Sequence, residues 1–461
     1  MVAAVVLTAI QALPAQQPQA THATASSPRP LSLPIDYYKL ANGLKVVLSR
    51  DTTSPDVVVA VYYGVGFRTE PRGRTGFAHL FEHMMFQGST NLGKMDFLRL
   101  VQSNGGDLNG TTRFDYTNFF ETVPANALEP ILWAEADRMK GLSIDSARLA
   151  NQRDVVKNEV RVNVLNAPYG GFRWLEVPIR ANTNWQNAHN FYGDFADLDA
   201  ASIDQVQDFF HTYYAPNNAV LVVAGDIDTA QARRWIDQYF TRIPRVLQPP
   251  PVDVSEPPQL VERRSTKVDA LAKRPAIGIA YHVPPRNTPE WYAFGLLDQL
   301  LAQGPDSRLY DALVRQRGLT GGIVAGINPL GTMYDVNGPT LWVVSAVHDT
   351  ATAPDSLLAV FERVLTPLRE APVDRATIDR AVLKIRSALI NTIENASDIG
   401  RAGLLASFAL FDDDPGRINR LEAAFAKVTP ALLQRTAQEY LVPTNRTVVT
   451  VIPGAPSSGH Q

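Results

Sequence analysis

The sequence predicts an α+β protein built from two homologous α/β roll-like domains, each with a mixed sheet flanked by helices. Three observations support this duplication. Several prolines cluster near the middle of the chain, between 244 and 275. A β-branched or apolar run precedes a helix-like segment on each side of that cluster, at 57–63 and at 276–281. Both halves also end on a Tyr- and Pro-containing turn followed by a strand pattern, at 214–223 and at 440–451.

The elements expected along the chain follow from these patterns. The first domain is expected to cover 31–243 and to contain the candidate site residues described below. The stretch 244–275 is rich in proline, which interrupts helices and central strands, and is predicted to be a linker. The second domain covers 276–453. Helices are expected at 204–213 and at 374–391, where apolar residues recur at helical spacing.

The two ends of the chain are predicted to lie outside the folded units. Residues 1–10 are apolar but shorter than the roughly 20 residues that span a bilayer, so no membrane span is expected. Ala23-Thr24-Ala25 has the small-residue pattern of a secretory cleavage site, so 1–30 is interpreted as a signal or disordered segment. Export to a periplasm or beyond is expected. The lack of Lys or Arg before the apolar run keeps a cytoplasmic location as the alternative. Residues 454–461 are expected to form a flexible tail.

Composition excludes several classes of function. The 461 residues are 45% hydrophobic and 19% charged, which is typical of a globular protein. Lys plus Arg is 43 and Asp plus Glu is 46, a net charge of -3, so nucleic acid is not an expected partner. Cysteine is absent, which excludes disulfides, thiolate metal sites and a cysteine nucleophile. Any metal must therefore be held by His, Asp or Glu.

Residues 76–86 carry the strongest chemical signal. They read Gly-Phe-Ala-His-Leu-Phe-Glu-His-Met-Met-Phe, and their apolar density predicts a largely buried helix. His79 and His83 are four residues apart, so a helix would place both imidazoles on one face, close enough to meet one ion at roughly 2.1 Å each. Glu82 shares that face and can take a proton from a zinc-bound water that attacks a peptide carbonyl. The alternative is two unrelated core or surface histidines with an ordinary helical glutamate.

The segment His79-Leu80-Phe81-Glu82-His83 is the inverted zinc motif His-x-x-Glu-His, and the chain resembles the pitrilysin or insulinase family of metallopeptidases, type M16. The likeness covers roughly 37–453. It includes Ala41-Asn42-Gly43-Leu44 before a first strand, and Gly64-Val65-Gly66 with Arg68 and Glu70 ahead of the motif helix.

The resemblance implies a zinc endopeptidase with one Zn²⁺ per chain. Its third metal ligand would be Glu159, on a later helix over 152–161, and its general base would be Glu82. Catalytic zinc typically has three protein ligands and an open position for water, so a third donor is required. Gln152 stands where relatives often have another Glu that orients the ligands. Its amide can hydrogen-bond a ligand but supplies no charge, so a lower metal affinity is expected.

A peptide substrate would lie next to the motif. Residues 104–112 are rich in turn formers, and 114–123 is rich in strand formers. The resemblance implies that peptides pair with an edge strand in the region of Asn109, Gly110 and Thr111. Such pairing binds main chain and gives little sequence preference. The alternative is a glycine-rich hairpin without a ligand role.

The sequence departs from active single-chain relatives in its second half. Those relatives carry an Arg and a Tyr, seven residues apart, that reach the substrate near the scissile bond. Aligning Ser307-Arg308-Leu309-Tyr310 and Gly318-Leu319 puts Val314 and Gly321 in those places. Donors that stabilise an oxyanion are then missing. The expected assembly is a heterodimer with a paralogous subunit that carries the Arg and Tyr, as in two-component members such as the mitochondrial processing peptidase.

Three functions are compatible with these sequence features. The leading hypothesis is a zinc endopeptidase that cleaves peptides or small unfolded proteins in a chamber between two facing halves. A noncatalytic peptide-binding or assembly subunit of the same fold is the alternative. A structural zinc site is disfavoured, because such sites usually have four protein ligands and often cysteine.

Overall fold

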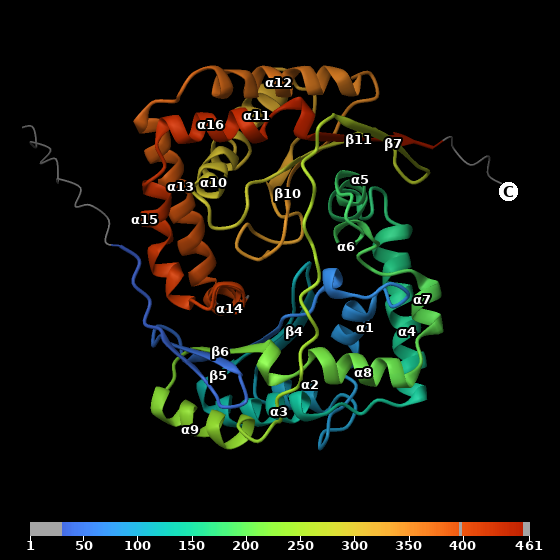
Figure 1. Cartoon of the computed structure of the whole chain (residues 1–461), viewed down its shortest axis with the longest axis vertical. Helices are drawn as coiled ribbons and strands as arrows, with labels where there is room; N and C mark the ends of the chain where they lie inside the picture. Colours follow the sequence, from blue (N-terminus) through green and yellow to red (C-terminus); the bar gives the residue numbers. More distant parts are fainter. Residues whose placement is uncertain (1–29, 396–398, 455–461) are drawn as a thin grey trace, which may run out of the picture.

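The computed structural model describes residues 30–395 and 399–454 (Figure 1). The signal segment predicted over 1–30 and the tail predicted over 454–461 lie outside this part of the chain, apart from residues 30 and 454. None of the helices in the described ranges is long and apolar enough to cross a membrane.

Each half of the chain contributes one sheet. The first half contains β1 (Asp36–Lys39), β2 (Lys45–Arg50), β3 (Asp56–Tyr63), β4 (Asp107–Thr112), β5 (Thr117–Pro124) and β6 (Ala219–Gly225). Its helices are α1 (Phe77–Met84), α2 (Asp96–Ser103), α3 (Leu128–Lys140), α4 (Ser146–Val160), α5 (Val177–Ala181), α6 (Trp185–Ala188), α7 (Phe195–Ala200), α8 (Ile203–Tyr213) and α9 (Thr229–Phe240).

The second half follows the same plan. Its strands are β7 (Arg263–Asp269), β8 (Ala276–His282), β9 (Val324–Ile327), β10 (Leu341–Val347) and β11 (Arg446–Pro453). Its helices are α10 (Pro289–Leu301), α11 (Arg308–Tyr310), α12 (Pro354–Glu370), α13 (Arg375–Glu394), α14 (Gly400–Asp412), α15 (Leu421–Ala426) and α16 (Pro430–Tyr440).

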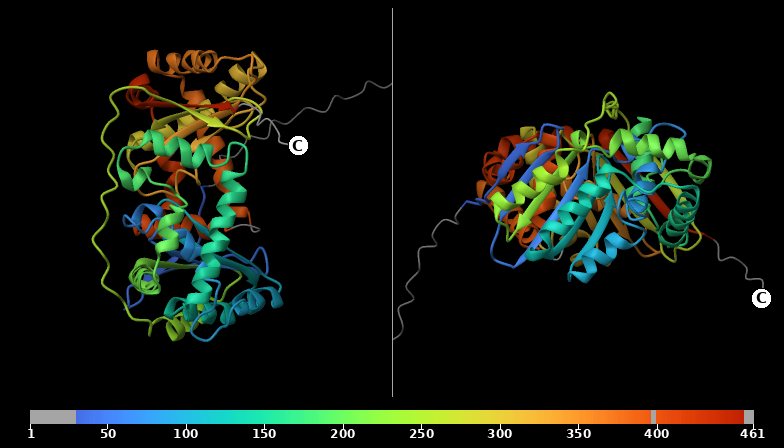
Figure 2. Two further views of the ribbon diagram at one scale, coloured as in Figure 1. Left: turned by 90° about the vertical axis from the view of Figure 1, so that its right-hand side faces the viewer. Right: turned by 90° about the horizontal axis from the view of Figure 1, so that it is seen from below.

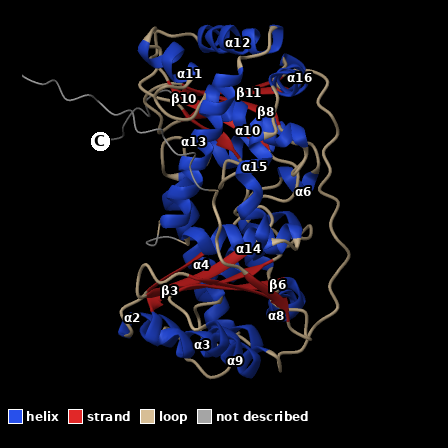
Figure 3. Ribbon diagram, turned by 90° about the vertical axis from the view of Figure 1, so that its left-hand side faces the viewer, coloured by secondary structure: helices blue, strands red, loops and turns tan. Residues whose placement is uncertain are grey.

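Strand order confirms the predicted duplication. The first sheet runs β1-β2-β6-β3-β5-β4 and the second runs β7-β11-β8-β10-β9. In each, a parallel pair, β2 with β6 or β7 with β11, is followed by antiparallel neighbours. The last strand, β4 or β9, pairs on one side only and forms an edge. The fold is therefore the predicted α+β architecture of two mixed sheets, shown well separated in Figure 3.

The connection between the halves is shorter than the predicted linker over 244–275. Residues 263–269 form β7, which pairs in parallel with β11. The polar sequence of β7 does not have the apolar pattern of a strand. Its backbone hydrogen bonds to the buried strand β11 stabilise it, rather than burial of its own side chains. Residues 244–262 have neither helix nor strand and run along one side of the molecule (Figure 2).

Each half of the chain covers one face of the other half's sheet. One face of the first sheet packs against helices of its own half, including α1, α3 and α8. Its other face packs against α14 from the second half, through Leu405, Phe408 and neighbouring apolar side chains. The second sheet is covered in turn by Phe172, Val177 and Ala181 from the first half. Each sheet therefore buries one face against residues from the opposite half.

Candidate metal centre

The helix α1 is fixed at its start by a buried carboxylate. Gly76 precedes the helix in a left-handed conformation (φ 84°), which favours glycine. Glu70, fully buried, accepts hydrogen bonds from the backbone N–H groups of Gly76 at 2.8 Å and Ala78 at 2.7 Å. His189 approaches the same carboxylate at 3.4 Å. Burial raises the pKa of Glu70, and these contacts oppose that rise by stabilising the charge.

The apolar side of α1 packs into the core and leaves its polar side facing α4. Phe77, Leu80, Phe81 and Met84 are buried against the first sheet and its helices. His79 and His83 lie on the side toward α4, with ring centroids 5.0 Å apart. The two helices pack together. The Asp145 side chain caps α4 by accepting a hydrogen bond from the N–H of Arg148.

Glu159 on α4 meets both imidazoles. Its two carboxylate oxygens lie 3.6 Å from Nε2 of His79 and 3.1 Å from Nε2 of His83. One donor atom from each of the three residues lies within 4.8 Å of the others. The structure therefore brings together the three side chains that the sequence and the resemblance singled out.

This arrangement fits a zinc ion. Donors that each lie about 2.1 Å from one tetrahedral zinc are separated by roughly 3.4 Å, close to the two distances observed. The neighbouring imidazoles of His79 and His83 hold the pKa of Glu159 well below its usual range, so its carboxylate is charged, as a cation ligand must be. Burial lowers the pKa of His79, but the acidic neighbours Glu159 and Glu82 outweigh it and leave that pKa raised.

Glu82 connects the metal-binding side chains to the edge strand β4. A Cβ atom added to Gly110 would lie 3.3 Å from Cγ of Glu82 and 3.0 Å from the ring of Phe119. The glycine therefore lets the backbone of β4 approach the carboxylate side chain closely. Residues 107–112, which looked turn-rich in sequence, form this strand. Asn109, Gly110 and Thr111 lie in it and pair with β5, which leaves the opposite side of β4 without a strand.

Gln152 is buried on α4, seven residues before Glu159, but its amide makes no hydrogen bond to the three candidate ligands. Its Nε2 donates instead to Asn151 at 2.8 Å. Nδ1 of His79 is buried and makes no hydrogen bond with a described residue.

Tyr192 is a neighbour of the site that sequence reasoning missed. Its ring packs edge-on against His79, with centroids 5.5 Å apart. Its hydroxyl oxygen accepts a hydrogen bond from Nε1 of Trp174 at 3.1 Å, so the proton remains available for donation. Burial raises the pKa of Tyr192, which keeps that proton in place at neutral pH. No motif in the sequence links Tyr192 with His79, which lies more than 100 positions earlier.

The segment that leads into α1 also holds the second half of the chain. Arg68 pairs with Asp115 through two contacts, at 3.1 and 3.2 Å, and donates to the carbonyl of Pro339. Asp115 accepts the N–H of Asn337 at 2.7 Å. Residues 337–339 are thus clamped next to the start of the metal-binding helix.

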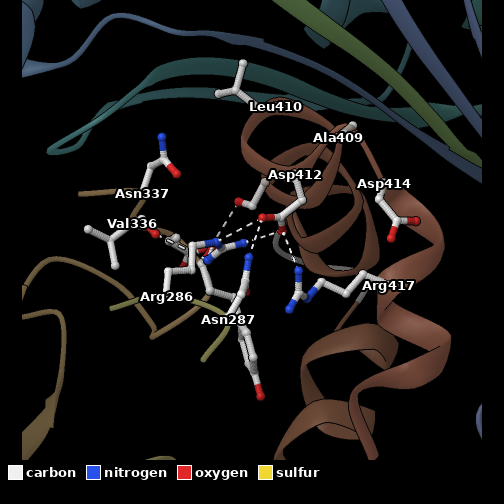
Figure 4. Close-up of polar contacts among 12 residues, drawn as sticks. Arg286, Asn287, Val336, Asn337, Ala409, Leu410, Asp412, Asp414 and Arg417 are labelled. Atoms are coloured by element: carbon white, nitrogen blue, oxygen red, sulfur yellow. Dashed lines mark hydrogen bonds and ion pairs between the residues drawn. The ribbon is translucent and has the colours of Figure 1, made fainter. Parts of the chain in front are cut away.

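The other side of the same loop is held by residues of the second half. Arg286 donates to the carbonyls of Tyr334 at 2.9 Å and Val336 at 3.2 Å, and pairs with Asp412 of α14 at 2.8 Å (Figure 4). Because both sides are held, the position of the loop relative to α1 is well defined.

Comparison with known proteins agrees with the fold and with the family resemblance. Residues 45–169 match the family described as insulinase (peptidase family M16), and residues 200–385 match the peptidase M16 inactive domain. The zinc protease PqqE of Helicobacter pylori is 25% identical over 420 residues, which cover 90% of this chain and 92% of that protein.

Solved structures show the same fold. The crystal structure of a protease from Helicobacter pylori superposes with a TM-score of 0.83 at 24% identity, over 91% of this chain and all of that one. The periplasmic protease PqqL from Escherichia coli gives a TM-score of 0.73 at 17% identity, over 92% of this chain but 48% of PqqL. When this chain is superposed on a solved structure of the first half of PqqL, the match covers 94% of that structure. With matches to both M16 domains in their expected order and a relative aligned over nearly its whole length, the chain belongs to peptidase family M16.

Proposed function

We propose that this chain is a zinc-dependent endopeptidase subunit that hydrolyses peptides or small unfolded proteins. The observation that supports this most directly is the convergence of His79, His83 and Glu159, with Glu82 on the same helix as the histidines. Two imidazoles and one carboxylate leave a bound zinc with a net positive charge. When bound, the zinc polarises the substrate carbonyl and makes water more acidic.

The residues of the chain would divide the remaining work. The backbone of β4 at Asn109, Gly110 and Thr111 would hold the peptide in an extended form by strand addition. Glu82, whose side chain lies beside Gly110, would take the proton from the attacking water and later deliver it to the departing amine. Tyr192, whose ring packs against His79, would offer its hydroxyl proton to orient groups in the site.

The proposal includes a paralogous partner subunit. Val314 and Gly321 occupy the two positions at which active single-chain relatives carry an Arg and a Tyr. Neither residue can donate a side-chain hydrogen bond to an oxyanion. The chain corresponds in length to one half of PqqL, which favours a two-part assembly in which a second, similar unit completes the site. A heterodimer would enclose the substrate between its two subunits.

The experiment compares four variants for zinc content and for hydrolysis of a quenched peptide, alone and with a paralogue from a neighbouring gene. His79→Ala and His83→Ala should lose bound zinc. Glu82→Gln should keep zinc and lose at least about 100-fold in rate, the lower end of the contribution of a general base. Glu129→Gln, on α3, is the control and should match wild type. Hydrolysis unaffected by a chelator would exclude the zinc mechanism, and full activity of the chain alone would exclude the shared site.

A noncatalytic peptide-binding or assembly role is the second candidate. The match of residues 200–385 to a domain described as inactive favours it. In that case the chain would bind peptides, with or without zinc, and Glu82→Gln would change no rate because no hydrolysis would be found with any partner.

A periplasmic or secreted location is also part of the proposal. It is supported by the apolar start of the chain and by the small-residue pattern at Ala23-Thr24-Ala25. Fractionation of cells that express a C-terminally tagged full chain, with the N-terminus of the product sequenced, tests it. An unprocessed N-terminus and recovery with cytoplasmic markers would overturn this part.

A further inference from the structure

Arg173 is a half-buried cation without a bonded partner in the described part of the chain. It lies in the π-helical turn Phe172–Glu176, just before α5. Its Nε is buried and makes no hydrogen bond, and no ion pair to its guanidinium is found among the described residues. Other buried arginines, such as Arg68, Arg138 and Arg446, each meet at least one carboxylate. A half-buried arginine whose guanidinium makes no hydrogen bond or ion pair with the described residues has donors available for an anion.

The Arg173 side chain lines a cavity of about 250 Å³ beside the edge strand β9. A Cβ on Gly326 of β9 would lie 3.4 Å from Nη2 of Arg173, so the glycine leaves the approach to the guanidinium open. The cavity is smaller than the roughly 300–1,000 Å³ typical of sites for drug-sized molecules. Its size suits one amino-acid side chain or one chain terminus.

Asp298 lines the same cavity but does not neutralise Arg173 by direct contact. One Asp298 oxygen accepts the indole N–H of Trp342 at 2.7 Å, and both are within 3.1 Å of Nε2 of Gln303. Burial also raises the pKa of Asp298 to about 6, which weakens its charge as the pH falls toward that value. Arg173 therefore keeps its hydrogen-bond donors for another group.

The cavity adjoins a second cavity that borders the edge strand proposed to bind substrate. It shares Gly331 and Thr332 as lining residues with a neighbouring cavity of about 460 Å³, and that cavity is also lined by Asn109 and Thr111 of β4. On the opposite side, Trp174, next to Arg173 in sequence, bonds to Tyr192, which packs on His79. Arg173 is thus linked, through neighbouring residues, to the edge strand β4 and to His79.

We propose that Arg173, with the cavity beside β9, forms a subsite that binds a carboxylate of the peptide substrate. The carboxylate belongs either to an Asp or Glu side chain or to the C-terminus of the peptide. Guanidinium and carboxylate groups can form paired, charge-assisted hydrogen bonds, which are stronger than neutral ones. This subsite rests on the proposed endopeptidase function and gives it a substrate preference.

The test uses two sets of quenched peptides. In the first set, one position at a time on each side of the cleaved bond is Glu or its isostere Gln. In the second set, the C-terminus is a free acid or an amide. For wild type with its partner, we expect kcat/KM to favour the carboxylate at one position, or at the C-terminus, by about tenfold, since a guanidinium–carboxylate hydrogen bond is charge-assisted and a tenfold preference needs only about 1.4 kcal/mol. The set that shows the preference identifies the source.

Arg173→Gln should bring the ratio of kcat/KM on the Glu or free-acid peptide to kcat/KM on the matched Gln or amide peptide close to one, and Arg173→Lys should keep part of the preference. Arg180→Gln, on α5, is the matched control, because Arg180 already pairs with Glu176. Since Arg173 makes no hydrogen bond within the described residues, the variant should fold, which thermal unfolding will verify. A preference that persists in Arg173→Gln, or no carboxylate preference in wild type, would overturn the subsite.

A binding measurement separates this proposal from the proposed function. Fluorescence anisotropy of labelled Glu and Gln peptides, with the Glu82→Gln chain, reports the subsite without turnover. If hydrolysis is absent but the Glu peptide still binds about tenfold more tightly through Arg173, the subsite stands and the enzymatic function fails. Equal binding of both peptides, with hydrolysis intact, would refute the subsite alone.

Discussion

Replacing Glu70 by Gln tests how the metal-binding helix is held in place. The carboxylate accepts two backbone hydrogen bonds at the start of α1, from Gly76 at 2.8 Å and Ala78 at 2.7 Å. Charge-assisted bonds contribute about 1.5–3 kcal/mol each, and a buried N–H left unpaired costs about 1–3 kcal/mol. The amide keeps one acceptor oxygen but turns an NH₂ group toward the other N–H. It also removes the negative charge that favours a helix N-terminus. The expected local destabilisation is about 3–5 kcal/mol.

Hydrogen exchange measured by mass spectrometry on peptides covering 76–84 provides the assay. A loss of about 3 kcal/mol corresponds to exchange more than about 100-fold faster for amides that open locally. Zinc affinity, measured by competition with a chromogenic chelator, should fall about 10- to 100-fold, because His79 and His83 are carried by the loosened helix.

Asp96→Asn is the control, because Asp96 is an exposed acid in the first turn of α2. It should leave exchange over 76–84 unchanged. Wild-type exchange rates and zinc affinity in Glu70→Gln would show that the buried carboxylate does not position α1.

Three further predictions concern other parts of the chain. Burial raises the pKa of Asp298 to about 6 from 3.8, so the folded state binds this proton more tightly. The stabilisation of the folded state by this bound proton is present below about pH 4 and is lost as the pH rises through about 6. Urea unfolding should show that the free energy of unfolding of wild type, relative to that of Asp298→Asn, falls by about 3 kcal/mol between these pH values. Gly110→Val should lower kcat/KM at least tenfold by crowding Glu82, with zinc content unchanged by elemental analysis. Arg68→Lys should cost about 2–4 kcal/mol in chemical unfolding, since Lys cannot contact both Asp115 and the Pro339 carbonyl.

Each of these has a clear opposite outcome. A pH-independent difference for Asp298→Asn would mean that this carboxyl titrates as in the unfolded chain. Wild-type hydrolysis by Gly110→Val would mean that β4 does not approach the general base in the working enzyme. Arg72→Lys is the control for Arg68→Lys, because Arg72 is exposed over the ring of Trp185. Equal losses of stability from the two substitutions would mean that the contacts of Arg68 with Asp115 and the Pro339 carbonyl do not stabilise the fold.

The sequence predicted the duplicated architecture, and together with the family resemblance it named the three side chains that converge at the candidate metal centre. Helical periodicity placed His79 and His83 on one face, because spacing of four residues fixes their relative direction whatever surrounds the helix. Glu159 is 76 positions after His83, and only the family resemblance linked it to them. Its approach to both rings depends on how α4 packs against α1, which local patterns do not encode.

Local sequence patterns do not reveal two of the strands, for the same physical reason: the edge strand at 107–112 was implied only by the family resemblance, and 263–269 was predicted to be linker. Residues 107–112 and 263–269 have polar or glycine-containing sequences that suggest turns or linker. Both are strands because a more strongly apolar neighbour, β5 or β11, offers backbone hydrogen bonds along its length. The roles of Glu70, Tyr192 and Arg173 were missed because each depends on contacts between distant segments.

Because each half covers one face of the other half's sheet, the two halves depend on each other for folding. A cut within 244–262 would leave each piece with one bare sheet face, because α14 and the segment around α5 would belong to the other piece. Neither fragment should be soluble when expressed alone. Expressed together, the fragments should reassemble, since each supplies the cover that its counterpart lacks, and the reassembled metal centre would report success.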